Sequence, residues 1–249
     1  MLKDVTLDRV IGENVLRKFD EDREAHIPSG KLSASILGNP LQWQVLKVIG
    51  VPTDFDEYVK RKLQRGKDVE DWIMKQLPGL VEGQKEIEYR GVVGYVDAVV
   101  DMKDYDFKCG VIPHEIKSVS NAKYLRIVGK GGKPGQGADH SHCLQVALYA
   151  LAMGSEYGAI DYIATDDYRI ETYIIKAADF KAEIDGIINK FDEAISSGYV
   201  PEFVEKEVWQ SNQKYNSYYE FMMLSLNAID EKLRTEFAEA YKVLKGKKK

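Results

Sequence analysis

Two apolar segments in the middle of the chain, residues 92–100 and 111–118, constrain the fold most strongly, because both have strand composition and yet contain charged residues. Short runs rich in valine and isoleucine and bounded by glycines are typical of strands in a buried sheet. Asp97 interrupts the first strand, where an unpaired charge is costly to bury. Glu115 and Lys117 lie two positions apart in the second, so their side chains project from one face. We therefore expect a central sheet with charged groups on one face.

Hydrophobic periodicity and glycine or proline breaks predict the other elements. In chain order these are helices near 5–22, 40–48 and 55–77, a strand near 86–89, a helix near 140–153, strands near 157–164 and 169–175, and helices near 178–196 and 215–245. This order predicts an α/β (α+β) fold in which helices flank a central mixed β-sheet.

The chain length of 249 residues suits one domain, 1–249, with a core at about 30–200 and a C-terminal helical appendage at about 205–249. A glycine- and lysine-rich segment, residues 129–137, interrupts the core. Its composition predicts a mobile loop that does not pack.

Composition excludes several classes of protein. No run of eighteen apolar residues is present, so no membrane span is expected. The charged first 22 residues lack a signal-peptide core, which favours a cytoplasmic protein. Cys109 and Cys143 are too few to hold an iron–sulfur cluster or a structural zinc ion unaided.

Net charge is a weak guide to the partner, because a polyanion responds to local charge. The whole chain carries a net charge of −5. Between residues 114 and 145, however, five lysine or arginine side chains stand against two acidic ones. This local excess of positive charge is compatible with binding to DNA.

The charged strand residues indicate a particular chemistry. If Asp97 lies on the strand beside Glu115, the two carboxylates repel each other unless a divalent cation sits between them. Hard oxygen ligands favour Mg²⁺ or Mn²⁺. Lys117 would then orient water or stabilise the charge that develops on a phosphate. The pattern indicates metal-assisted hydrolysis of a phosphodiester bond.

Asp97 followed by Glu115-Ile116-Lys117 resembles the motif of the PD-(D/E)XK nuclease superfamily, and the chain is most similar to its RecB-like branch, which includes phage-type exonucleases. The resemblance implies a restriction-endonuclease-like core with helical N- and C-terminal additions. It also implies that Asp97, Glu115 and the carbonyl of Ile116 hold one or two Mg²⁺ or Mn²⁺ ions and that Lys117 is catalytic. The cysteines that hold an iron–sulfur cluster in some relatives are missing, so no such cluster is expected.

Flanking segments extend the resemblance. Gly66 followed four residues later by Glu70 fits a helical motif that adds a metal ligand, which implies this role for Glu70. Gln145 and Tyr149 fit a Gln-x-x-x-Tyr motif and share one helical face, which implies that both line the catalytic site. The segment 33–35 resembles a serine motif near the start of many relatives. The residues expected to contact nucleic acid are Ser33, Ser35, Lys123, Arg126, Lys130, Lys133, His142, Gln145 and Tyr149.

Each feature also has a structural interpretation. Glu115 and Lys117 can form a solvent-exposed charge pair, Glu70 can be a solvated helix residue, and His142 can cap a helix start. For function, the leading hypothesis is an exonuclease or end-processing enzyme that acts on single- or double-stranded DNA, with a recombination protein as partner; the resemblance also suggests a phage origin. The alternatives are a catalytically silent DNA-binding subunit of a recombination or defence complex and a nuclease that acts on RNA.

Overall fold

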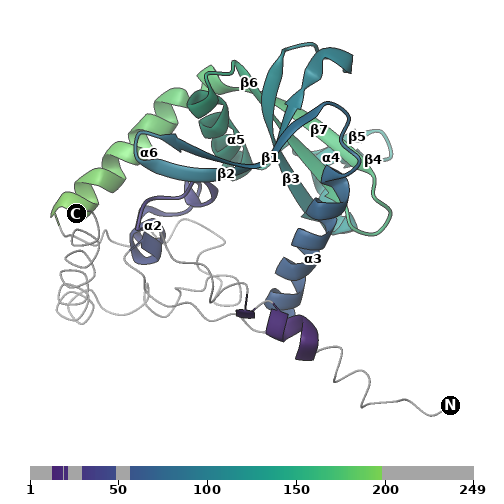
Figure 1. The fold of residues 1–249 in the computed structure, drawn as a ribbon, viewed down its shortest axis with the longest axis horizontal. Coiled ribbons are helices and arrows are strands. Elements are labelled where there is room, and N and C mark those ends of the chain that lie inside the picture. Colours follow the sequence, from purple (N-terminus) through teal and green to yellow (C-terminus); the bar gives the residue numbers. More distant parts are fainter. Residues whose placement is uncertain (1–12, 19, 22–29, 49–56, 198–249) are drawn as a thin grey trace.

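The computed structural model describes residues 13–18, 20–21, 30–48 and 57–197. Their centre is a five-stranded sheet in the order β1-β2-β3-β6-β7 (Figure 1). Only β3 and β6 run parallel, while the other neighbours in this described sheet are antiparallel. The strands are β1 Leu80–Tyr89, β2 Val92–Asp101, β3 Val111–Val119, β6 Tyr157–Ala164 and β7 Ile170–Lys176. The sheet confirms the predicted mixed architecture and is consistent with a restriction-endonuclease-like core.

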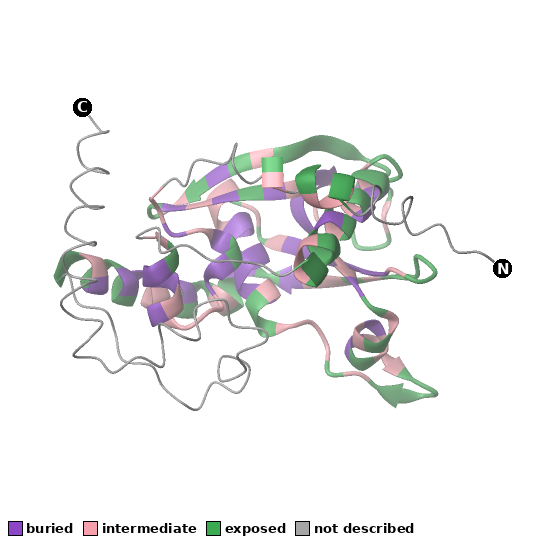
Figure 2. Ribbon diagram, turned by 90° about the horizontal axis from the view of Figure 1, so that it is seen from below, coloured by how far each residue is buried: buried purple, intermediate pink, exposed green. Residues whose placement is uncertain are grey.

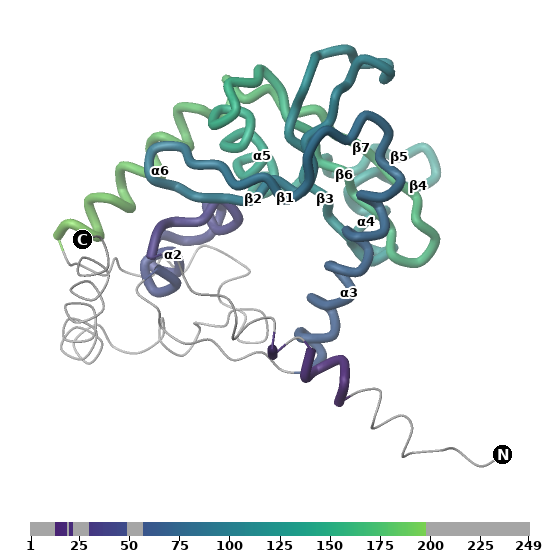
Figure 3. Tube along the Cα trace, viewed as in Figure 1, coloured from purple at the N-terminus to yellow at the C-terminus, as the bar shows by residue number. Residues whose placement is uncertain are grey.

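Helices cover both faces of the sheet, and Figures 1 and 3 show α5 and α6 on the side away from α3. The helical segments are η1 Ala34–Ile36, α2 Leu41–Val48, α3 Glu57–Met74, η2 Met102–Asp104, α4 Asn121–Val128, α5 His140–Met153 and α6 Ala177–Ser197. The middle of α5 is apolar and buried all round, because the sheet lies on one side of it and α6 on another. Buried residues accordingly gather between the sheet and these helices (Figure 2).

The glycine-rich segment corrects one expectation. Residues 129–137 are predicted to be an unpacked loop, but they form a short hairpin of β4 Gly129–Lys130 and β5 Lys133–Pro134. Backbone hydrogen bonds from Gln136 N to Arg126 O (2.9 Å) and from Gly137 N to Ile127 O (3.1 Å) tie the hairpin to α4. The sequence pattern does not predict α4. It therefore also does not predict the hydrogen bonds by which α4 stabilises the hairpin.

The two ends of the chain are described only in part. The helix expected at 5–22 is present over residues 13–18 and 20–21. The expected appendage at 205–249 lies outside the described residues. Within the described part of the chain, every helix is too short or too polar to cross a membrane.

Asp185 connects α6 to the turn between β1 and β2. Its carboxylate accepts hydrogen bonds from Arg90 (2.8 Å), Tyr89 (3.2 Å) and Lys181. The bonds from Lys181 and then Arg90 lower the pKa of Asp185 to about 2. A lowered carboxyl pKa stabilises the fold above the unfolded value and loses this effect as the pH falls toward 2.

We expect Asp185→Asn to destabilise the fold by about 1 kcal/mol at pH 7, because partly exposed ion pairs are screened by solvent. The difference from wild type should shrink to nearly nothing at pH 2. Urea unfolding of both proteins across this pH range measures it. An equal difference at both pH values would contradict the account.

Candidate active site

Asp97 lies where β2 and β3 separate. The hydrogen-bonded register of the two strands runs from Asp101 opposite Val111 to Ala98 opposite His114. One step further would place Asp97 opposite Glu115, but the ladder stops there. Instead, Asp97 Oδ2 accepts a hydrogen bond from the backbone N–H of Ile116 at 2.7 Å. The aspartate side chain thus replaces a main-chain partner and holds its carboxylate against the backbone of Ile116, the residue that follows Glu115.

Glu115 is buried, with an exposed fraction of 3%. Its Oε1 accepts hydrogen bonds from Lys117 Nζ and from Gln145 Nε2, the latter at 2.8 Å. Its Oε2 is also buried and has no hydrogen-bond partner among the described residues. The interpretation of Glu115 as one half of a solvent-exposed pair is therefore wrong. A buried carboxylate oxygen without a partner is costly, so Oε2 is an atom that a bound cation would satisfy.

Helix α3 brings Glu70 to this cluster. Val69 and Ile73 pack against Ile116 and Ile163 on the other face of the sheet, which fixes the helix beside β3. Glu70 accepts a hydrogen bond from Gln84 Nε2 at 2.5 Å. Burial and the charge of Glu115 raise the pKa of Glu70. The helix residue is therefore part of the carboxylate cluster rather than a freely solvated side chain.

Helix α5 closes the site from the other side. Gln145 Nε2 donates to Tyr149 Oη at 2.8 Å as well as to Glu115. Tyr149 packs close to β2 because position 94 is glycine: a Cβ there would lie 2.7 Å from Tyr149 Cε1 and 3.0 Å from Ala34 Cβ. The predicted helical face of Gln145 and Tyr149 thus faces Glu115.

His142 lies at the start of the same helix. Its Nδ1 is 2.8 Å from Tyr162 Oη and 3.8 Å from the carboxylate of Asp139. Burial and the positive charges of Lys117 and Lys123 lower the pKa of His142 to about 3. The ring is therefore neutral at pH 7 and adds no positive charge to the site.

The charges of the cluster do not balance. Burial, Glu115 and Glu70 raise the pKa of Asp97 to about 9. Burial lowers the pKa of Lys117, but the carboxylates of Glu115, Asp97 and Glu70 outweigh burial and raise it overall, so the amine stays protonated. Among the residues that the structure describes, three carboxylates thus share one ammonium group. A divalent cation is the ordinary way to keep such a cluster ionised.

The residues present fit a hard divalent ion, since their free atoms are carboxylate oxygens. In the described part of the chain, no three histidine, cysteine, aspartate or glutamate side chains are already arranged to hold a metal. In this arrangement Asp97 accepts a hydrogen bond from the backbone of Ile116, Glu115 Oε1 from Lys117, and Glu70 from Gln84. Among the fully buried carboxylate oxygens of the described residues, Oε2 of Glu115 has no hydrogen-bond partner and is available to an ion.

The residues expected to bind nucleic acid occupy three places, of which the α5 residues His142, Gln145 and Tyr149 are one. Ser33 and Ser35 have their hydroxyl oxygens 3.0 Å apart, and Ser33 forms an isolated bridge with Val93, a residue of the active-site strand β2. The basic residues lie on α4 and on the hairpin after it: Lys123, Arg126, Lys130 and Lys133. Lys123 is bonded to Asp139 at 2.6 Å, whereas the other three are exposed.

The sequence pattern does not single out Gln84, Asp139 or Tyr162. Gln84 reaches Glu70 from a left-handed backbone position, φ 51°, that no residue pattern predicts. Tyr162 Oη accepts the backbone N–H of Asp139 at 3.0 Å and so supports the start of α5. The apolar composition of β6 gives no sign of this contact, which joins residues 23 positions apart.

No protein-family model matches this sequence, and no curated protein matches it in sequence. Several solved structures have a similar fold. One is the crystal structure of SSO0001, at 19% identity and TM-score 0.44, over 84% of this chain and 94% of that one. Another is an alkaline exonuclease, LHK-Exo, from Laribacter hongkongensis, at 15% identity and TM-score 0.44, over 68% and 92% of the two chains. LHK-Exo in complex with dAMP has 15% identity and TM-score 0.42, over 68% and 91%. Sequence identities of 15–19% and TM-scores of 0.42–0.44 say nothing about the function of the site. Its assignment therefore depends on the geometry of this chain alone.

Proposed function

We propose that the protein is a metal-dependent nuclease that hydrolyses phosphodiester bonds of DNA. The observation that carries the proposal is the buried, unpartnered Oε2 of Glu115 within a cluster of three carboxylates and one lysine among the described residues. A carboxylate that serves only in a structural charge pair has no need of an unpartnered oxygen, because water or protein donors bind both of its oxygens. A site that holds a divalent cation next to a phosphate does require such an oxygen.

The residues have distinct roles in this proposal. Asp97, Glu115, Glu70 and the carbonyl of Ile116 hold the ion. Bound Mg²⁺ or Mn²⁺ supplies Lewis-acid chemistry that makes the phosphorus more open to attack by water. Lys117, protonated and next to Glu115, stabilises the negative charge that develops on the phosphate.

Two residues of α5 act through Glu115. Gln145 fixes the orientation of the glutamate by donating to its Oε1, and Tyr149 in turn accepts from Gln145. Both lie beside the bound strand in this proposal, and neutral His142 with the serines at 33 and 35 contacts its backbone. The second function class, a silent DNA-binding subunit, is disfavoured because the acidic cluster would be a pure cost in stability without an ion.

The exposed lysines of the hairpin supply interactions with DNA that do not depend on sequence. Removing one lysine that neutralises a phosphate makes the plot of log K against log salt concentration shallower by about one unit of slope. We expect Lys130→Ala combined with Lys133→Ala to weaken DNA binding about tenfold at low salt and to make this slope shallower by about two. Fluorescence anisotropy with labelled DNA at several salt concentrations measures both. Unchanged affinity and slope would show that the hairpin does not touch the DNA.

Cleavage of end-labelled nucleic acid tests the function. The full chain is incubated with linear and circular DNA, single- and double-stranded, and with matched RNA, in Mg²⁺, Mn²⁺ or a chelator. An end-processing deoxyribonuclease degrades linear DNA from its ends, spares circles and RNA, and stops with chelator. Degradation of RNA alone would establish the RNA alternative, and binding without cleavage would establish a silent subunit.

The setting of this activity is a further part of the proposal. We propose an intracellular role beside a recombination protein, with the pair encoded by a phage. Co-purification of the full chain from phage-infected host cells tests it. Recovery of the chain without a recombination protein would contradict the proposed partner.

A further inference from the structure

A second polar site lies on the face of the sheet opposite the carboxylate cluster. His114 stands next to Glu115 on β3, and Asp161 lies on the neighbouring strand β6; both are buried, with exposed fractions of 1% and 4%. Asp161 accepts hydrogen bonds from Thr172 Oγ1 at 2.6 Å and from His114 Nδ1 at 2.7 Å. These side chains share one face because Asp161 stands directly opposite Thr172 on β7.

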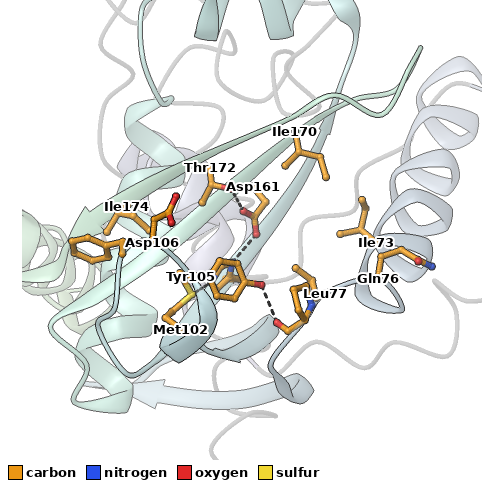
Figure 4. A pocket seen from close by; sticks show the side chains of 13 residues that line it. Ile73, Gln76, Leu77, Met102, Tyr105, Asp106, Asp161, Ile170, Thr172 and Ile174 are labelled. Carbon is orange, nitrogen blue, oxygen red and sulfur yellow. Dashed lines mark hydrogen bonds and ion pairs between the residues drawn. The ribbon is translucent and has the colours of Figure 1, made fainter.

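The side chains of His114 and Asp161 both line a pocket of about 520 Å³. Figure 4 shows Asp161 and Thr172 side by side in this pocket. Residues of α3 make one wall, the segment around Tyr105 makes another, and β7 makes a third. The walls are mostly apolar, including Ile73, Leu77, Met102, Phe107, Ile170 and Ile174. Pockets of this size with a few fixed polar groups are the usual form of sites for small molecules.

His114 Nε2 lacks a strong hydrogen-bond partner among the described residues. Its neighbour is the thioether of Met102, whose sulfur lies 3.4 Å away. A thioether has no hydrogen to donate and accepts only weakly, so it satisfies neither a neutral nor a protonated ring. Since Nδ1 is held by Asp161, the ring cannot turn to find another partner without breaking that bond. A buried ring nitrogen in this state is a ready partner for a ligand.

The charges around the pocket limit the ligand. Asp161 lines it from β6 and Asp106 lines it at the surface. Two carboxylates disfavour an anion such as a phosphate. The walls favour an aromatic body. Because Nδ1 donates to Asp161, Nε2 is free to accept and favours a group that can donate a hydrogen bond. A hydroxyl on an uncharged aromatic ring satisfies both conditions.

We propose that this pocket binds a small, uncharged aromatic molecule whose single hydroxyl group hydrogen-bonds to His114 Nε2. The proposal does not rest on the proposed function, because none of the residues that line the pocket belongs to the carboxylate cluster. Thr172 and Asp161 hold the histidine in position, and the aromatic body of the ligand replaces water against the apolar walls.

Two probes that differ in the hydroxyl hydrogen test the proposal: 2-naphthol and 2-methoxynaphthalene. Binding to the full chain is measured by probe fluorescence, and the ¹⁵N resonances of the histidine rings report which ring is contacted. We expect saturable binding of 2-naphthol, a shift of the His114 resonance, and at least tenfold weaker binding of the methoxy compound. The anion 2-naphthoate should bind more weakly still.

Variants at the pocket give a matched comparison. Ile170→Trp places a larger side chain at an exposed lining position and should abolish binding of both probes. Val111→Trp is the control, since Val111 is similarly exposed (46% against 49%) but does not line the pocket. His114→Phe should bind the two probes equally. If His114→Phe does not fold, the comparison of Ile170→Trp with Val111→Trp and the histidine ring resonances still test the proposal.

Absence of saturable binding by the wild type would overturn the proposal. So would wild-type affinity for 2-naphthol in Ile170→Trp, equal affinity of the wild type for the two probes, or a resonance shift confined to histidines other than His114.

Discussion

Lys117→Ala should reduce phosphodiester cleavage by about 10³-fold, the usual loss when one fixed charge that stabilises a transition state is removed. The pKa of Lys117 responds to all three carboxylates of the cluster, and its ammonium group contacts Glu115 directly. The loss should appear in kcat, because the charge that Lys117 stabilises develops only during the reaction. End-labelled linear DNA under single-turnover conditions provides the measurement.

The matched control is Lys176→Ala, which removes an exposed strand lysine paired with Glu156 at 3.5 Å. This variant should cleave at the wild-type rate. Circular dichroism in the presence of Mg²⁺ should show that both variants are folded, since the ion offsets the charge of Glu115 when Lys117 is absent. Wild-type cleavage by folded Lys117→Ala would remove the lysine from the mechanism.

Asp97→Asn should have opposite effects on activity and stability. The amide oxygen can still accept the hydrogen bond from Ile116 N, but the repulsion with Glu115 and Glu70 disappears. We expect cleavage to fall at least about 10²-fold. In chelator at pH 7 the variant should be more stable than wild type, on the order of 2 kcal/mol, because it does not bury a carboxyl group that resists ionisation.

The raised pKa of Asp97 also determines how the free energy of unfolding changes with pH. The pKa of Asp97 is raised from 3.8 to about 9, so folding takes up a proton between these values. Without metal, the wild type should therefore lose stability as the pH rises from about 4 to about 9, and Asp97→Asn should lose less. Urea unfolding in chelator measures both curves. If stability fell equally with pH in both proteins, or if Asp97→Asn were the less stable protein at pH 7, the claim that repulsion within the cluster raises the pKa of Asp97 would be contradicted.

Much of the fold followed from local patterns. The valine-rich segment with Asp97 and the alternation around Glu115 correspond to β2 and β3, and the four-residue spacing of Gln145 and Tyr149 lies on one face of α5. These features are predictable because a strand repeats every two residues and a helix about every 3.6. Asp97 and Glu115 come together because β2 and β3 are neighbours in the sheet.

Other features depend on tertiary packing and have no local signal. The hairpin at 129–137 is ordered because α4 supports it through backbone bonds, although its composition is typical of a loop. The contact between His114 and Asp161 joins residues 47 positions apart, through the parallel pairing of β3 and β6. Gln84 reaches Glu70 only because its backbone adopts a positive φ. Propensities do not encode such contacts.

The central claim is that the carboxylates of Asp97, Glu115 and Glu70 form the binding site of a divalent cation. Titration of the full chain with Mn²⁺, followed by electron paramagnetic resonance of the free ion, tests it without DNA or turnover. The account predicts saturable Mn²⁺ binding by the wild type, competed by Mg²⁺, and at least tenfold weaker binding by Glu115→Gln and Asp97→Asn. Equal binding of Mn²⁺ by the wild type and both variants would contradict it.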